Sequence, residues 1–260
     1  MRLAHPAYGQ LRAVTDTASV LLCDNPGLLT LEGTNTWILR ASGSDEFVVV
    51  DPGPDDAAHI ERIAALGKVA LVLISHRHGD HTDGIDKLVD LTGATVRSVG
   101  SGFLRGLGGP LTDGEVIDAA GLRITVLATP GHTADSVSFL LDDAVLTADT
   151  VLGRGTTVID DEDGSLRDYL ESLRRLAGLG ARTVLPGHGP DLPDIRDVAA
   201  MYLAHRQERL DQVRDALREL GADAGARRIV EHVYTDVDEK LWDAAEKSVQ
   251  AQLDYLMSTD

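Results

Sequence analysis

The stretch SHRHGDHTDG, from Ser75 to Gly84, places three histidines and an aspartate within six residues. It follows the apolar run Val69–Ile74, which is typical of a strand buried on both faces of a sheet. A polar loop at the end of a rigid strand is a common place for a functional site. The stretch therefore predicts a site at a sheet edge and favours an α+β or α/β body.

The spacing within this stretch suits metal binding. His76 and His78 are two residues apart, so in extended backbone their side chains point the same way. Asp80 and His81 come after an intervening glycine, where the chain can turn tightly. Such a loop can offer two histidines to one metal ion, and an aspartate with a histidine to a second.

Three later motifs repeat the arrangement of a short apolar run followed by one possible ligand. These ligands are His132 in TPGHT, Asp149 after the run 144–147, and His188 in PGHG. Five of the nine histidines therefore follow a predicted strand and lie near glycine. Imidazole and carboxylate groups together suit zinc, iron or manganese.

The rest of the chain divides into a mixed body and a helical tail. Strand patterns lie at 36–39, 47–50, 69–74, 95–99, 116–118, 122–127, 137–141, 144–147 and 183–185, and helical patterns at 55–66, 84–91 and 165–178. Asp55 and the Ser165/Asp168 pair are predicted helix caps. From Ile195 onward the pattern is helical, so we expect a catalytic domain over residues 1–194 and a helical domain over 195–260.

Composition limits the partners. The net charge of −18 disfavours long-range attraction to nucleic acid or anionic membranes, so double-stranded DNA and membrane partners are not expected. The apolar runs are far shorter than the ~20 residues that cross a bilayer. One cysteine, Cys23, allows no disulfide framework and fits a cytoplasmic protein. Nothing in the sequence points to a particular oligomeric state.

The ordered motifs H-x-H-x-D-H, P-G-H-T, a strand-end aspartate and P-G-H-G resemble the metallo-β-lactamase fold superfamily. The resemblance implies an α+β fold, a four-layer αββα sandwich with a dinuclear site at one edge. It implies two divalent ions, zinc first with iron or manganese as alternatives, held as follows: His76, His78 and His132 for one, Asp80, His81 and His188 for the other, and Asp149 bridging both.

This ligand set implies hydrolysis. Two divalent ions roughly 3.5–4 Å apart can share a water molecule and lower its pKa from about 15.7 toward 7. The bridging hydroxide then attacks an electrophilic carbon or phosphorus, and the ions stabilise the developing oxyanion. Asp80 is the predicted catalytic carboxylate, which orients the nucleophile or handles its proton.

Segments outside the metal motifs narrow the resemblance. Asn25–Leu39, Val151–Ile159 and Tyr202–Leu210 are similar to the beta-lactamase-like protein 2 family. That family implies a metal-dependent endoribonuclease acting on single-stranded RNA, with a C-terminal winged-helix-like piece. The candidate substrate-binding residues are Asn35, Arg154, His205 and Arg206.

Two other functions stay open. A thioester or ester hydrolase of the hydroxyacylglutathione hydrolase type would use the same seven ligands on a small molecule. A non-enzymatic metal-binding protein is the third possibility, although all seven ligand positions are occupied. The tail weakens the RNA hypothesis, because residues 196–260 carry nine Lys/Arg against fourteen Asp/Glu, whereas phosphate binding favours a basic surface.

Overall fold

The computed structural model describes residues 8–159, 163–235 and 238–259. Its two sheets have the strand orders β1-β2-β3-β4-β5-β6 and β11-β10-β9-β8-β7. The first contains β1 (Leu11–Ala13), β2 (Ala18–Leu22), β3 (Asn35–Leu39), β4 (Glu46–Val50), β5 (Lys68–Leu73) and β6 (Val96–Arg97). The second contains β7 (Val116–Ala119), β8 (Leu122–Ala128), β9 (Val137–Leu140), β10 (Ala144–Ala148) and β11 (Thr183–Pro186).

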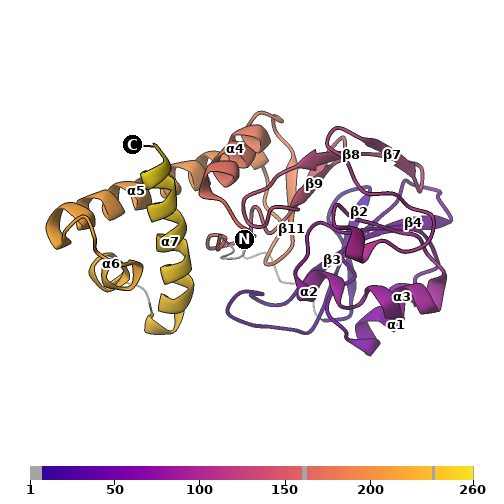
Figure 1. The fold of residues 1–260 in the computed structure, drawn as a ribbon. Coiled ribbons are helices and arrows are strands. Elements are labelled where there is room, and N and C mark those ends of the chain that lie inside the picture. Colours follow the sequence, from indigo (N-terminus) through magenta and orange to yellow (C-terminus); the bar gives the residue numbers. More distant parts are fainter. Residues whose placement is uncertain (1–7, 160–162, 236–237, 260) are drawn as a thin grey trace.

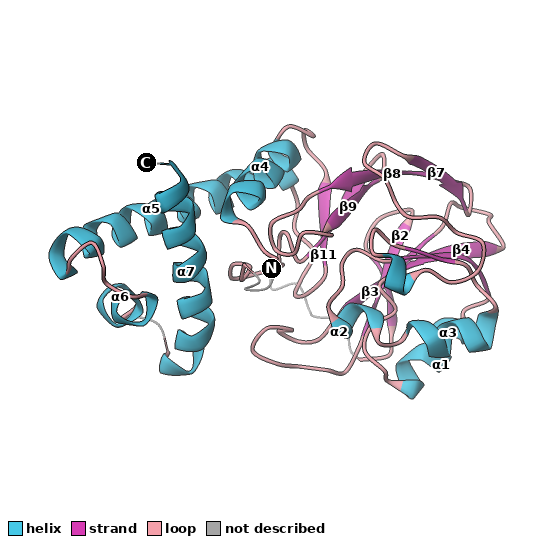
Figure 2. Cartoon of the chain, viewed as in Figure 1, coloured by secondary structure: helices cyan, strands magenta, loops and turns pink. Residues whose placement is uncertain are grey.

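Helices cover the outer faces of both sheets, as Figures 1 and 2 show. α1 (Ala57–Ala65) and α3 (Ile85–Thr92) cover the first sheet, and α4 (Leu166–Ala177) covers the second. The remaining helices are α2 (Gly79–Thr82), α5 (Ile195–Leu220), α6 (Ala226–Val233) and α7 (Trp242–Thr259), with short 3₁₀ turns η1 (Ser101–Phe103) and η2 (Glu239–Leu241). The predicted four-layer αββα sandwich is confirmed, and a helical domain follows it.

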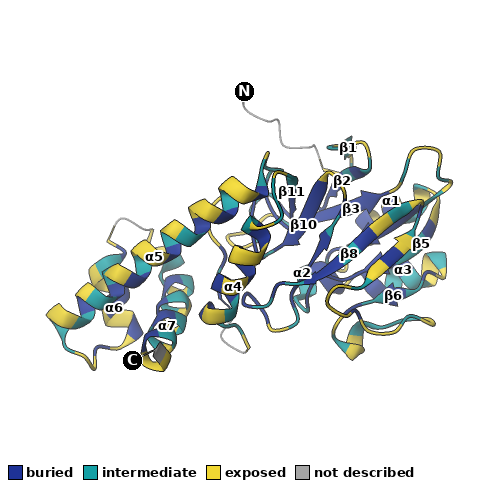
Figure 3. Cartoon of the chain, turned by 90° about the horizontal axis from the view of Figure 1, so that it is seen from above, coloured by how far each residue is buried: buried dark blue, intermediate teal, exposed yellow. Residues whose placement is uncertain are grey.

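Three apolar clusters hold these layers together. One lies between the sheets and joins Val50 and Leu73 of the first sheet to Phe139 of the second. Another packs α1 and α3 against the first sheet. The third covers the second sheet with α4 and continues without a break into α5, α6 and α7. Fully burying one such aliphatic side chain contributes about 1.5–3 kcal/mol, so the helical domain is fixed to the sandwich by a shared core (Figure 3).

Most predicted elements lie within one or two residues of their expected bounds, and α5 begins at Ile195. The Ser165 cap is confirmed, because its Oγ accepts a hydrogen bond from the Asp168 backbone N–H. The Asp55 cap is wrong. Asp56 caps α1 by accepting from the His59 N–H, while the Asp55 carboxylate lies 2.5 Å from Lys87 Nζ.

The sequence analysis missed the hairpin β1–β2 at the edge of the first sheet. β1 is only three residues long and largely exposed, so it carries no buried face that periodicity could reveal. It also took the 75–84 stretch as a loop, whereas Gly79–Thr82 forms the single helical turn α2. Among the described residues, no helix is long and apolar enough to cross a membrane.

Candidate metal centre and its cleft

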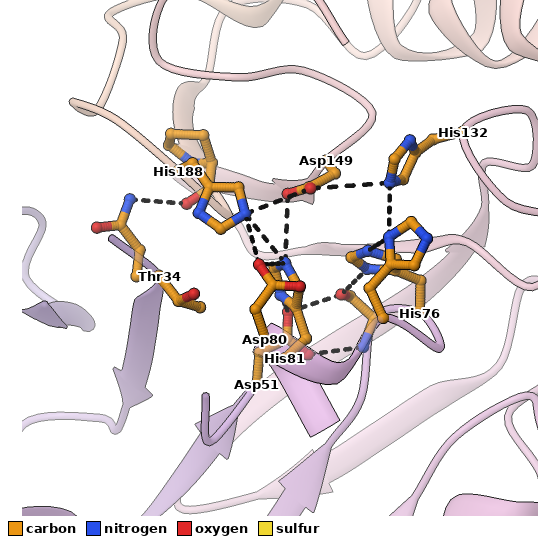
Figure 4. Close-up of polar contacts among 12 residues, drawn as sticks. Thr34, Asp51, His76, Asp80, His81, His132, Asp149 and His188 are labelled. Carbon is orange, nitrogen blue, oxygen red and sulfur yellow. Dashed lines mark hydrogen bonds and ion pairs between the residues drawn. The ribbon is translucent and has the colours of Figure 1, made fainter. Parts of the chain in front are cut away.

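The seven predicted ligands converge at one edge of the sandwich, as Figure 4 shows. β5 leads into the segment that carries His76, β8 into the loop with His132, and β10 directly into Asp149. β11 pairs parallel with β10 and ends beside it, which brings His188 next to Asp149. Neighbouring strand ends thus gather side chains that are up to 112 residues apart in the chain.

Three histidines form the first cluster. The Nδ1 atom of His78 lies 3.0 Å from His76 Nε2 and 3.1 Å from His132 Nε2. Their nitrogens lie within 4.8 Å of one another, close enough to hold one metal ion. Two of the three histidines are buried and His78 is half-buried, so one side of the cluster is open.

Asp80, His81 and His188 form the second cluster. The Asp80 Oδ2 atom lies 3.1 Å from His188 Nε2, and His81 Nε2 lies 3.3 Å from the same nitrogen. The turn α2 makes this possible, because it carries Asp80 and His81 side by side toward the end of β11. The spacing predicted from the sequence therefore separates the ligands into the two expected groups.

Asp149 lies between the clusters. One carboxylate oxygen is 3.7 Å from His132 Nε2 in the first cluster and 3.4 Å from His188 Nε2 in the second. The other oxygen, Oδ1, is buried, accepts no hydrogen bond and lies 3.5 Å from His81 Nε2. A buried carboxylate oxygen in that state suits a metal ligand, and its position between the clusters suits a bridge.

The backbone around the clusters orients the imidazole rings. The Nδ1 atom of His132 donates to the Val158 carbonyl at 2.7 Å, and that of His188 donates to the Gly33 carbonyl at 3.0 Å. A carbonyl only accepts, so each ring carries a proton on Nδ1 and points its Nε2 atom toward its cluster. This arrangement is typical of metal-binding histidines.

Asp51 is a site residue that the sequence analysis missed. It is 2% exposed, and its carboxylate accepts from the Ser75 N–H at 2.8 Å, from Ser75 Oγ at 2.6 Å and from His81 Nδ1 at 3.0 Å. Ser75 Oγ in turn lies 2.9 Å from His76 Nδ1. One carboxylate therefore orients a histidine in each cluster. The sequence did contain a signal for Asp51, which directly follows the apolar run 47–50, just as the predicted ligands follow other apolar runs.

The glycine before His188 leaves room for the centre. A Cβ atom on Gly187 would lie 2.4 Å from Asp149 Oδ1 and 2.9 Å from His81 Cε1. Only glycine fits at this point without displacing a cluster residue. The buried Asp149 oxygen that accepts no hydrogen bond, the oriented histidines and this close approach together fit a pair of divalent cations.

The electrostatics favour a cation in the second cluster. Burial lowers the pKa of His76 well below its ordinary value, and neighbouring His81 adds to that effect. Burial also acts on His188, but Asp149 outweighs it and raises the His188 pKa to about 9. For Asp149 itself, burial raises the pKa, while His188 and His81 outweigh it and hold the value well below the ordinary range. The carboxylates thus attract positive charge to the centre.

A cleft of about 720 Å³ opens over both clusters. Its lining includes His78, Asp80, His132, Asp149 and His188 from the two clusters. Beyond them the lining comes from both domains. Its aliphatic residues are Leu28, Leu29 and Leu31 of the β2–β3 loop, Leu152 and Val158 of the segment after β10, and Leu241, Ala244 and Ala245 of η2 and α7. Its polar residues are Thr30, Arg154, Thr156, Thr157, His205, Arg209, Tyr234 and Ser248. The helical domain therefore forms part of the cleft.

Two of the four predicted substrate-binding residues, Asn35 and Arg206, do not line the cleft. Asn35 is 2% exposed, and its Nδ2 donates to the Pro186 and Gly189 carbonyls on either side of His188. Arg206 is 3% exposed, donates to the Thr157 carbonyl and stacks on an aromatic ring. Asn35 thus braces the His188 loop, and Arg206 braces the segment after β10, in place of the substrate contacts expected from the sequence.

The other two predicted residues line the cleft. Arg154 pairs with Glu32. His205 is half-buried, and its Nδ1 atom is buried without a hydrogen-bond partner. Arg209, one turn further along α5, also lines the cleft, where its guanidinium lies 4.5 Å above the Tyr234 ring.

The fold and the paired His/Asp clusters define a metallohydrolase, and comparison with known proteins agrees. The chain belongs to the Metallo-beta-lactamase superfamily, whose sequence model matches residues 29–188. A second model, the Beta-lactamase associated winged helix domain, matches residues 226–260. The described part of that segment contains α6, η2 and α7, so the predicted winged-helix-like appendage is confirmed.

Relatives with different names match most of the chain. The Beta-lactamase-like protein 2 homolog of Caenorhabditis elegans is 30% identical over 241 residues, which cover 87% of this chain and 79% of the relative. The Atrochrysone carboxyl ACP thioesterase of Aspergillus fumigatus is 33% identical over 215 residues, covering 77% and 64%. The crystal structure of a beta-lactamase domain protein from Burkholderia ambifaria superposes with a TM-score of 0.82 at 22% identity, covering 99% and 91%, and shows the fold alone.

Proposed function

We propose that this protein is a metal-dependent hydrolase of thioesters or esters whose acyl part is apolar. The observation that carries the proposal is the cleft of about 720 Å³, in which leucine, valine and alanine side chains share one lining with residues of both clusters. Such a lining suits an acyl chain better than a polyanion, because apolar groups gain by leaving water whereas phosphates do not. Similarity to an acyl carrier protein thioesterase supports the same substrate class.

The metal centre in this proposal uses His76, His78 and His132 for one ion, Asp80, His81 and His188 for the other, and Asp149 between them. The chemistry that such ions supply when bound is activation of a water molecule and stabilisation of negative charge on the attacked carbonyl. Zinc is our first choice for both ions, with iron or manganese as alternatives.

Asp80 is the proposed catalytic carboxylate. Its side chain is 27% exposed, whereas that of Asp149 is 12% exposed, and it lines the cleft where a substrate carbonyl would lie. Burial raises its pKa, but His81 and His188 outweigh this and lower it, so the group is ionised near neutral pH. A carboxylate in this position can orient a water molecule or take up its proton.

The polar atoms of the cleft suit a thioester's leaving group. His205 offers a buried Nδ1 without a partner, and burial lowers its pKa, so the ring is neutral near pH 7. A neutral imidazole can hydrogen-bond to an amide or hydroxyl of a thiol such as a pantetheine arm. Arg154 pairs with Glu32, and Arg209, which also lines the cleft, stacks on the Tyr234 ring.

Single-stranded RNA is the second candidate substrate. Similarity to the Beta-lactamase-like protein 2 homolog over 87% of the chain favours it. Against it stand the net charge of −18 and the placement of Arg206 away from the cleft. Non-enzymatic metal binding is the weakest alternative for a member of a hydrolase family.

One assay separates these candidates. Zinc-loaded protein is incubated with decanoyl-coenzyme A, followed by thiol release, and in parallel with labelled single-stranded RNA. A His78→Ala variant serves as the metal-site control, since His78 contacts both other histidines of its cluster. We expect thiol release that the variant lacks and no RNA cleavage above it. Cleavage of RNA alone would assign the protein to the ribonuclease class.

A further inference from the structure

The part of the cleft formed by α7 is built from small side chains. Ala244 and Ala245 lie on the first turn of α7, Ser248 lies one turn further on, and all three line the cleft beside Leu241 of η2. Ala245 is 8% exposed, and Val249 behind it belongs to the apolar core. This wall is therefore anchored from behind while its front presents only two methyl groups and one hydroxymethyl group.

The opposite wall comes from the β2–β3 loop. Leu28 and Leu29 are 65% and 60% exposed, and both line the cleft together with Leu31. The loop is held in shape by the Gly27 N–H bond to the Leu31 carbonyl at 3.1 Å and by Thr30 Oγ1, which donates to the Asn25 carbonyl at 2.7 Å. Figure 1 shows the loop reaching toward α7. Exposed leucines on a braced loop suit contact with an apolar ligand.

We propose that these two walls hold the acyl chain of the substrate, and that the small residues of α7 set the longest chain accepted. The inference rests on the proposed thioester hydrolysis and names its acyl group as an unbranched aliphatic chain. The two walls carry two side-chain hydroxyls, from Thr30 and Ser248, and Thr30 Oγ1 already donates to the Asn25 carbonyl; the polar residues His205, Arg209 and Tyr234 line other parts of the cleft. A nucleobase would leave its polar edges unpaired there, whereas methylene groups need no partner.

The consequence is a chain-length preference that α7 controls. Each methylene that leaves water for an apolar site raises transition-state affinity by about fourfold. In the native protein kcat/KM should therefore rise from acetyl- through hexanoyl- to dodecanoyl-coenzyme A until the pocket is filled. A phenyl ring at Ala244 would occupy the space in front of α7 and lower that limit.

The test compares Ala244→Phe with Gln250→Phe, which adds the same ring to an exposed position of α7 outside the cleft. We expect the dodecanoyl-to-acetyl ratio of kcat/KM to fall at least about tenfold in Ala244→Phe and to stay within twofold in Gln250→Phe. Ala244→Leu should fall between them. This smaller variant keeps the test informative if the phenyl ring prevents folding.

A binding measurement without turnover supplies a second readout. Calorimetric titration of the metal-free protein with dodecanoate should show binding that Ala244→Phe weakens by about tenfold or more and Gln250→Phe preserves. A flat chain-length profile, or equal ratios in both variants, would overturn the pocket while leaving the thioesterase proposal intact. Failure of the native, metal-loaded protein to cleave any of the three thioesters would overturn the proposed function itself.

Discussion

The replacement Asp51→Asn tests how the centre is held. Asparagine keeps the side-chain shape, and it also tolerates the left-handed backbone at this position, where φ is +54°. The Oδ1 atom can still accept from the Ser75 N–H, but an NH₂ group then replaces the oxygen that accepts from Ser75 Oγ and His81 Nδ1. The new NH₂ group is a hydrogen-bond donor, and it faces Ser75 Oγ and His81 Nδ1, which are donors in the native protein.

The tautomers of two ligands change as a result. To accept from the new amide, Ser75 must donate its hydroxyl proton to His76 Nδ1, which moves the ring proton to Nε2. His81 loses the acceptor that holds its proton on Nδ1. Loss of one such orienting partner lowers metal affinity by about 10- to 100-fold, or about 1.4–2.7 kcal/mol. With one ligand affected in each cluster, we expect the upper end of this range.

The assay is zinc competition with a chromophoric chelator, run on native protein, Asp51→Asn and Asp118→Asn. Asp118 is an apt control because its side chain is 80% exposed and lies on β7, far from the motifs. Unfolding of the metal-free proteins should be measured in parallel, since losing a buried charged acceptor also costs about 1.5–3 kcal/mol. A zinc affinity of folded Asp51→Asn within threefold of native would refute this account of ligand orientation.

Three further outcomes are expected. Gly187→Ala should lower zinc affinity at least about tenfold, because its Cβ would lie 2.4 Å from Asp149 Oδ1; an unchanged affinity would mean that the β11 end moves freely. Burial lowers the His59 pKa from 6.5 to about 4, so the unfolded chain takes up a proton at His59 before the folded chain does. The free energy of unfolding should therefore be highest above pH 6.5 and fall by about 3 kcal/mol between pH 6.5 and 4. Denaturant unfolding across this range should show this fall in the native protein and not in His59→Gln, and parallel curves would contradict it. Arg206→Met removes the contact to the Thr157 carbonyl and should destabilise the fold by about 1–3 kcal/mol in thermal melts, whereas an unchanged melting temperature would argue against a bracing role.

The metal ligands could be predicted from the sequence because local rules place them. Each follows a short apolar run, and the ends of these strands, from both sheets, meet at one edge of the sandwich. Asp51 obeys the same rule after β4, but a lone aspartate without histidine or P-G-H neighbours gives a weak signal. Its function depends on contacts to Ser75 and His81, which only the folded chain brings together.

The residues that line the substrate cleft were harder to predict, because packing between distant elements determines which side chains face it. Arg206 illustrates a signal that was present: it shares the helical spacing of Tyr202, Leu210 and Val213, which are all buried on one face of α5. That face turns to the core, so a charged residue on it braces the structure. By contrast, no local pattern in α7 could reveal that Ala244 lines a cleft formed with a loop more than 200 residues earlier.

The most direct test of the central claim is a metal titration of thioester hydrolysis. Protein stripped with a chelator is given increasing zinc, and thiol release from decanoyl-coenzyme A is followed at each step. Two separate ligand clusters joined by Asp149 predict negligible turnover without metal and a plateau at two ions per chain. Full turnover by the stripped protein, or none at two ions per chain, would contradict a dinuclear thioester hydrolase.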